Sequence, residues 1–267
     1  MPDPLTGTLA TGSGGLVGLV LGMVGGGGSI LAVPLLVYVV GVASPHVAIG
    51  TSAVAVSAGA LGNLFAHSRL GNVKWPCATV FGATGVLGAF AGAAVAKAIG
   101  GEQLLALFGA LMIVVGIVML LRRGAGGDPE VRLTGQTAAK MLPPLLGIGF
   151  SVGLFSGFFG IGGGFLIVPG LMLATGMPLR FAIGTSLVAV AAFGAATAAS
   201  YALSGLVDWP LAGLFVLGSL AGGLVGTRLG RALADRRQAL GTVFAGLVIA
   251  VGLYVVARGI LALVAHT

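Results

Sequence analysis

Six uninterrupted apolar stretches of about 20 residues constrain the fold of this chain more than any other feature. They cover residues 45–66, 76–98, 103–121, 178–203, 209–229 and 238–263. A helix of roughly 20 apolar residues crosses the hydrocarbon core of a bilayer, which is about 30 Å thick. Only 7% of the residues are charged, whereas a water-soluble domain usually has about 25%. The sequence therefore predicts an all-α polytopic membrane protein.

Two further apolar runs, residues 8–41 and 141–175, are interrupted by glycine clusters at residues 25–29 and 160–164. As one helix rising about 1.5 Å per residue, the first run would be roughly 50 Å long. Consecutive glycines destabilise a helix interior by about 1 kcal/mol each relative to Ala. We therefore expect each run to form two short helices joined by non-helical backbone. Such backbone persists at membrane depth only where protein or a water-filled cavity surrounds it.

The two halves of the chain are related in sequence. The pentapeptide Ala-Ile-Gly-Thr-Ser at residues 48–52 recurs at 182–186, an offset of 134 residues. A Gly-x-Val-x-Trp-Pro motif that starts at Gly71 recurs at Gly205 with the same offset. We therefore expect an internal duplication, in which each repeat has a broken or re-entrant helix pair followed by three transmembrane helices. The expected first membrane repeat is 1–121, the cytoplasmic linker 122–140 and the second membrane repeat 141–267.

The distribution of positive charge indicates how the repeats are oriented, because Lys and Arg concentrate in cytoplasmic loops. If each broken run crosses the membrane once, the 13 Lys and Arg divide seven to six between the two sides. If each run enters and leaves on one side, they divide eleven to two, with only Lys97 and Arg258 on the minor side. This favours two repeats in inverted topology with both termini outside the cytoplasm. It also accounts for the net charge of +7 without a nucleic-acid partner.

The glycine breaks are the candidate binding site, because inverted repeats with broken helices are typical of secondary transporters. A half-helix that starts at a break leaves its first N–H groups unpaired at a positive dipole end, which attracts anions. For the neighbouring hydroxyl and amide side chains, close helix packing and hydrogen bonds within or between helices are the alternative role. The candidate substrate-binding residues are Gly26, Gly27, Gly28, Ser29, Gly162, Gly163 and Gly164 at the breaks, with Thr51, Ser52, Asn63, Thr185 and Ser186 beside them.

Three basic side chains, His46, His67 and Arg180, are candidates for gating or steering an anion. An ordinary interfacial position is the alternative for each of them. All six acidic residues fall in termini or loops, so we expect no carboxylate at mid-membrane that could bind a cation or relay protons. The single cysteine, Cys77, excludes an intramolecular disulfide and a thiolate metal cluster. We expect neither a metal nor a cofactor.

The order of the motifs along the chain is also informative. Each half has a glycine-rich break followed by a proline, then Gly-Thr-Ser, then Trp-Pro. This order, from about residue 8 to 258, resembles the sulfite exporter TauE/SafE family of membrane permeases. The resemblance implies export of sulfite, of organosulfonates such as sulfoacetate or of related sulfur-containing anions across a bacterial inner (plasma) membrane. The implied partners are this small anion and the lipid bilayer, and the sequence is compatible with a homo-oligomer. The matching positions are Pro34 and Pro169, residues 50–52 and 184–186, and Trp75 and Trp209.

A secondary transporter, not an enzyme, is the leading interpretation. A channel-like conductor of small anions is the alternative, since the expected membrane core lacks coupling carboxylates. An intramembrane serine protease is the least favoured, because it needs a Ser paired with a His inside the membrane. The nearest serine context is Ser13, and both His46 and His67 are expected near the membrane interfaces.

Overall fold

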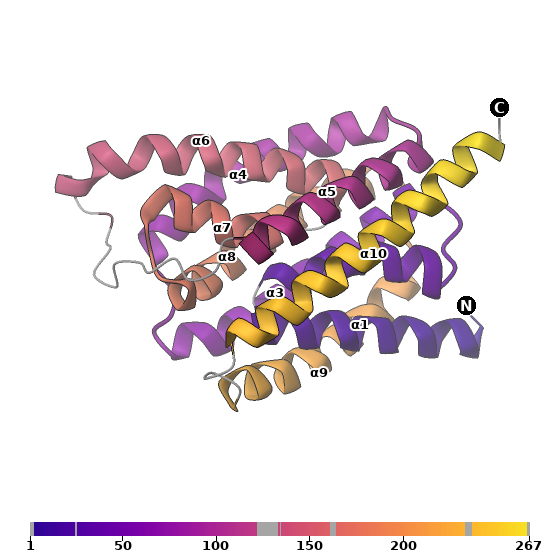
Figure 1. Cartoon of the computed structure of the whole chain (residues 1–267), viewed down its shortest axis with the longest axis horizontal. Coiled ribbons are helices and arrows are strands. Elements are labelled where there is room, and N and C mark those ends of the chain that lie inside the picture. Colours follow the sequence, from indigo (N-terminus) through magenta and orange to yellow (C-terminus); the bar gives the residue numbers. More distant parts are fainter. Residues whose placement is uncertain are drawn as a thin grey trace.

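The computed structural model describes residues 3–24, 26–121, 133, 135–160, 164–232 and 237–265, and the regular elements within these ranges are all helices. Eight of the described helices are long and apolar enough to cross a membrane. In Figure 1 they run along the long axis of the molecule, and α1 begins at the end of the bundle where α10 ends. This agrees with the prediction of an all-α polytopic membrane protein. The eight are α1 (Pro4–Val24), α3 (Pro45–Arg69), α4 (Trp75–Lys97), α5 (Gly101–Leu121), α6 (Gly135–Phe159), α8 (Leu179–Ala202), α9 (Trp209–Ala232) and α10 (Arg237–Ala265).

Both glycine clusters interrupt a helix, as expected, but neither divides its run into two short helices. The first member of each run is a full-length helix, with 21 residues in α1 and 25 in α6. The expectation of two short helices is therefore wrong for α1 and α6, because each of these helices includes all the apolar residues of its run that precede the glycines. Only the return segments are short. They are η1 (Gly26–Leu31), α2 (Ala32–Pro34) and η2 (Leu35–Val39) after α1, and α7 (Gly164–Thr175) after α6.

Residues 26–29 of the first break form a tight 3-10 segment, so the expectation of non-helical backbone is wrong for them, whereas Gly25 lies outside the described residues. Gly26, Gly27, Gly28 and Ser29 all lie in η1. A side chain at Gly28 would collide with the backbone of Val20 and Leu21 in α1. Glycine therefore allows η1 to fold back closely against α1, and the narrow 3-10 geometry suits this contact.

The main helix pairs of the described bundle each take one member from either half of the chain: α1 with α9, α4 with α6, α3 with α8, and α5 with α10. Glycines bring two of these pairs into backbone contact. A methyl group added at Gly222 in α9 would meet the backbone of Gly15 in α1, and one at Gly88 in α4 would meet that of Phe150 in α6. Small residues permit such close approach between membrane helices. The two halves are consequently interlocked.

The central pair, α3 and α8, is the most buried of the candidate spans, with 67% and 78% of their apolar windows inside the protein. A methyl group at Gly50, near the start of α3, would meet the backbone of Leu206 just beyond α8. One at Gly184, near the start of α8, would meet the backbone of Asn72 just beyond α3. The two helices therefore run antiparallel, and their ends make equivalent contacts at the 134-residue offset.

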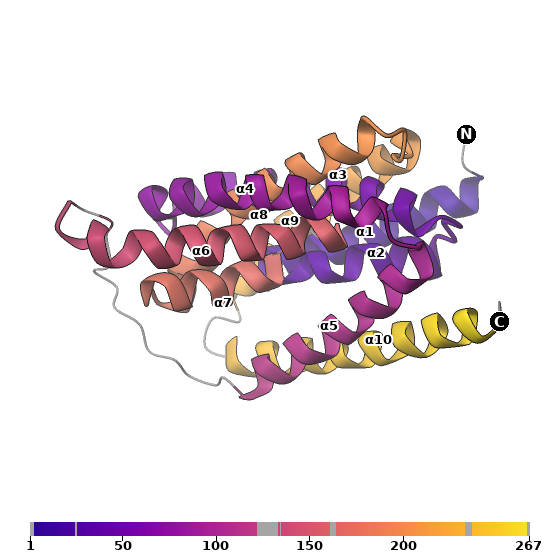
Figure 2. The same ribbon diagram turned by 90° about the horizontal axis from the view of Figure 1, so that it is seen from above.

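Helices α5 and α10 form an antiparallel pair at one side of the bundle (Figure 2). Gly109 of α5 packs against Gly252 of α10, and Gly116, two turns later in α5, packs against Ala245, which is earlier in α10. This pair leaves large apolar side chains exposed, including Leu121 and Val243. Exposed apolar side chains on such helices are suited to contact with lipid.

Replacing Gly222 by Ala is expected to loosen the packing of α9 on α1. The added methyl group meets the backbone of Gly15, so the helices must separate at a cost of about 1–3 kcal/mol. Gly213→Ala is the matched control on the same helix, because a methyl group there meets nothing within 4 Å. Thermal unfolding of the protein in detergent micelles should show a lower Tm for G222A and an unchanged or higher Tm for G213A. Equal Tm values for the two variants would contradict the contact.

Candidate functional site

Thr51 and Thr185 attach two loops to the central helix pair. Thr51 of α3 is fully buried, and its Oγ1 accepts a hydrogen bond of 3.0 Å from the backbone N–H of Asp208. Thr185 of α8 is also fully buried, and its Oγ1 accepts a 3.0 Å hydrogen bond from the backbone N–H of Lys74. Lys74 and Asp208 directly precede α4 and α9. The recurrence of threonine in both halves thus has a structural basis, since each hydroxyl fixes the start of a helix.

The structure does not bring these two threonines together. Near the centre of the pair, Ser57 Oγ of α3 donates a 2.8 Å hydrogen bond to the carbonyl of Ala191 in α8. Thr51 and Thr185 each lie six residues before these positions, on helices that run in opposite directions. They are therefore separated by roughly 18 Å along the helix axes, at about 1.5 Å per residue. A single small ligand cannot reach both hydroxyls in this conformation.

The two serines that follow the threonines make different contacts. Ser186 Oγ donates a 2.8 Å hydrogen bond to the carbonyl of Ile183 within its own helix. Ser52 Oγ lies 2.9 Å from the carbonyl of Ile49 and 3.3 Å from that of Gly160, at the end of α6. Gly160 has a φ of 67°, a left-handed conformation that favours glycine. Ser52 is thus a predicted site residue that touches the second glycine break.

Asn63 is almost completely buried on α3. Its Nδ2 donates a 3.0 Å hydrogen bond to the carbonyl of Gly59, one turn earlier in the same helix. A methyl group at Gly223 of α9 would lie 2.8 Å from Nδ2, so the amide also packs directly against the neighbouring helix. In this conformation Asn63 has the hydrogen bond within its own helix that buried polar side chains in membrane helices require.

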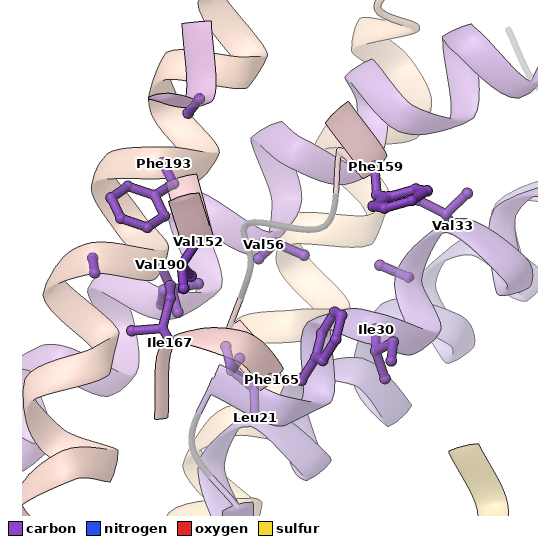
Figure 3. Packing of buried hydrophobic residues seen from close by; sticks show 14 of the residues in the cluster. Leu21, Ile30, Val33, Val56, Val152, Phe159, Phe165, Ile167, Val190 and Phe193 are labelled. Carbon is purple, nitrogen blue, oxygen red and sulfur yellow. The ribbon is translucent and has the colours of Figure 1, made fainter. Parts of the chain in front are cut away.

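Apolar side chains fill the space where the two return segments approach each other. Ser29 of η1 and Gly164 at the start of α7 are both buried. Figure 3 shows the ring of Phe165 beside Ile30, and the ring of Phe159 beside Val33. The remaining candidates at this break, Gly162 and Gly163, lie outside the described residues.

A cavity of about 50 Å³ lies at the end of the bundle where α3 ends and α8 begins. We call it the His67–Arg180 cavity. His67 comes from the last turn of α3 and Arg180 from the first turn of α8, and Asn72 and Thr227 contribute further polar groups. The structure therefore brings two of the three predicted gating or steering residues to one cavity. The sequence could not predict that His67 and Arg180 lie close together, because they are more than a hundred residues apart.

Lys74 adds a third basic side chain at the same end of the bundle. Its Nζ lies 4.5 Å from the centroid of the Phe181 ring, and Arg180 Cζ lies 4.3 Å from the same centroid. Both contacts are cation–π interactions, which hold positive groups over an aromatic face. Only the fold shows that the loop carrying Lys74 lies beside the start of α8.

His46, the third candidate for gating, lies at the opposite end of the bundle, in the first turn of α3. Its ring centroid is 6.5 Å from that of Tyr201 at the end of α8. It therefore does not contribute to the His67–Arg180 cavity. Among the described residues, no cluster of three His, Cys, Asp or Glu side chains could hold a metal.

A wider cavity, of about 330 Å³, lies at the end of the bundle where His46 is found. Its lining includes Thr6 at the start of α1, residues 40–44 after η2, and Asp208 before α9. The start of α1 and the end of the return segment are consequently neighbours. The first broken run enters and leaves at the same end of the bundle.

Thr51→Val and Thr185→Val are expected to destabilise the fold. Valine keeps the shape but leaves the partly buried N–H of Asp208 or Lys74 without its acceptor, at a cost of about 1 kcal/mol each. Thr51→Ser and Thr185→Ser keep the acceptor and are the matched controls. Chemical denaturation in detergent should rank both valine variants below their serine counterparts, and the reverse order would refute the role of these hydroxyls.

Comparison with known proteins identifies the family. Residues 10–255 match the model of the family described as sulfite exporter TauE/SafE. A probable membrane transporter protein of Xylella fastidiosa (strain 9a5c) is 51% identical over 95% of this chain and 96% of its own length. The probable membrane transporter protein YdhB of Bacillus subtilis is 26% identical over 80% of this chain and 86% of its own. A search of solved structures found no match. The chain belongs to the sulfite exporter TauE/SafE family of membrane transporters.

Proposed function

We propose that this chain is a secondary transporter that exports sulfite, an organosulfonate or a related sulfur-containing anion. Membership of the family supports the transporter class. The observation that carries the proposal of an anion is the His67–Arg180 cavity, with Lys74 beside it. A guanidinium makes strong, charge-assisted hydrogen bonds to oxyanions, and an imidazole N–H can also donate a hydrogen bond to them. A mouth lined by positive charge also raises the local concentration of anions.

We further propose that the protein spans a bacterial inner membrane as two repeats in inverted topology, with both termini outside the cytoplasm. The repeats are residues 1–121 and 141–267, joined by the cytoplasmic linker 122–140. The division of Lys and Arg, eleven to two, supports this orientation. The equivalent contacts at the two ends of the α3–α8 pair also favour it. The His67–Arg180 cavity then opens toward the cytoplasm, where an exported anion is collected.

From this cavity the anion would pass between η1 and α7. The proposed midplane ligands are the backbone N–H groups of residues 26–29 and 162–164. Phe165 and Ile30 close this space in the present conformation (Figure 3), so binding requires the two return segments to separate. We also propose that the anion contacts the hydroxyls of Ser52 on α3 and Ser186 on α8, and the amide of Asn63 on α3.

The two threonines would take part in the same movement. Each hydroxyl is now bonded to the loop before α4 or α9. If the two repeats rock against each other about the α3–α8 pair, the loop on the side that opens moves away from its threonine. The hydrogen bond between them then breaks, and the hydroxyl becomes available to the anion. Thr51 and Thr185 would then contact the anion one at a time, which fits their separation along the pair. This is the behaviour expected of a carrier, in which access alternates around the site.

Arg180→Gln and His67→Gln should weaken capture of the anion from the cytoplasm. We expect the half-saturation concentration for [35S]sulfite uptake into inside-out membrane vesicles to rise about tenfold, because a charge-assisted contact is lost. Arg228→Gln is the matched control, since Arg228 is an exposed cation on α9 that is not among the residues lining the cavity. Equal effects of all three variants would refute a specific role for the cavity. Saturable counterflow would support a carrier, whereas ohmic conductance would support the channel alternative.

Labelling of single cysteines should place both termini outside the cytoplasm. In a Cys77→Ala background, cysteines introduced at Asp3 and Thr267 should react with a membrane-impermeant maleimide in intact cells with a permeabilised outer membrane. Arg69→Cys, at the proposed cytoplasmic end of α3, should react only after the inner membrane is opened. Protection of either terminus in intact cells would overturn the proposed topology.

A further inference from the structure

The residues of the His67–Arg180 cavity have counterparts at the other end of the bundle. At the offset of 134 residues, His67 corresponds to Tyr201 and Arg180 to His46. Tyr201 and His46 are neighbours in the structure, with ring centroids 6.5 Å apart. The same pair of positions therefore meets twice, once at each end of the antiparallel α3–α8 pair. Each meeting brings together side chains that can bind an anion.

Two polar atoms at this second position are buried without a hydrogen-bond partner. Tyr201 is fully buried, and its hydroxyl has no partner. His46 Nδ1 is also buried and has none. Folded proteins rarely leave such atoms unpaired, and the exceptions call for a ligand, an ion or water. A phenol hydroxyl and an imidazole N–H both donate hydrogen bonds, so acceptor oxygens fit this position.

Lys97, at the end of α4, supplies positive charge close to the ring of Tyr201. Its Nζ lies 5.8 Å from the centroid of the Tyr201 ring. It donates hydrogen bonds to the carbonyl of Ser200 at 3.1 Å, to Ser200 Oγ at 3.1 Å and to Ser204 Oγ at 2.9 Å. These partners are uncharged, so they satisfy the three N–H groups without neutralising the ammonium. An oxyanion would bind Lys97 more strongly than these hydroxyls do, because both partners would then be charged.

We propose that His46, Lys97 and Tyr201, which we call the Tyr201 cluster, form a second anion site that holds the substrate before its release. The anion takes one Lys97 N–H from the serines and accepts hydrogen bonds from Tyr201 and His46. In the present conformation the bonds from Lys97 tie the end of α4 to the end of α8 and close this site. This inference rests on the proposed function. It adds to it the residues that bind the anion on the side of the membrane where the anion is released.

The test compares the two faces of the membrane. Tyr201→Phe and Lys97→Gln should raise the half-saturation concentration for sulfite about tenfold in right-side-out vesicles, where the anion meets the Tyr201 cluster first. In inside-out vesicles the same variants should change this concentration less than they do in right-side-out vesicles, because the first contact there is the His67–Arg180 cavity. Tyr201→Phe keeps the ring, so its packing in α8 is preserved.

A variant with the opposite effect separates binding from a purely structural role. Ser204→Ala removes one acceptor that competes for Lys97, so it should lower the half-saturation concentration in right-side-out vesicles. If Tyr201→Phe and Lys97→Gln change neither face, or change both faces equally, the Tyr201 cluster is not an anion site. Absence of sulfite counterflow in the unmodified protein would overturn the proposed function together with this inference. Normal counterflow with unshifted variants would overturn the inference alone.

Discussion

The structure depends on close backbone contact between helices from opposite halves of the chain. Inside a bilayer, apolar side chains gain nothing by leaving lipid, so association relies on packing that small residues allow. The contacts of Gly222 with Gly15 and of Gly88 with Phe150 are equivalent in the two halves. They interlock the halves so that each end of the bundle is built from both. Every candidate site therefore combines side chains that are far apart in sequence.

This interlocking explains how one duplicated sequence produces two different ends. The α3–α8 pair places the end of one helix beside the start of the other at both ends. At one end the meeting side chains are His67 and Arg180, which line a cavity. At the other they are Tyr201 and His46, beside Lys97, which is bonded to α8. The backbone arrangement is shared, whereas the side chains give each end its own chemistry.

Hydrophobicity and repetition predicted much of the fold, but local patterns could not supply the contacts between halves. The bounds of α3 and α8 differ from the predicted stretches by no more than three residues, because prolines at or just before the first turn, Pro45 and Pro178, also mark where these apolar helices begin. The 3-10 geometry of η1 was missed, since it arises from packing against α1. The loop partners of Thr51 and Thr185 were missed for a similar reason, because each bond joins residues more than a hundred positions apart.

If a sulfur oxyanion passes through the interface between the two halves, as we propose, it must bind there. A structure determined by cryo-electron microscopy at saturating sulfoacetate would show where the anion binds. We expect density for the sulfonate within hydrogen-bonding distance of His67 and Arg180 while Lys97 remains bonded to Ser200. Sulfonate density on the lipid-facing side of α5 and α10, or no density in a protein that transports sulfoacetate, would overturn the proposed path.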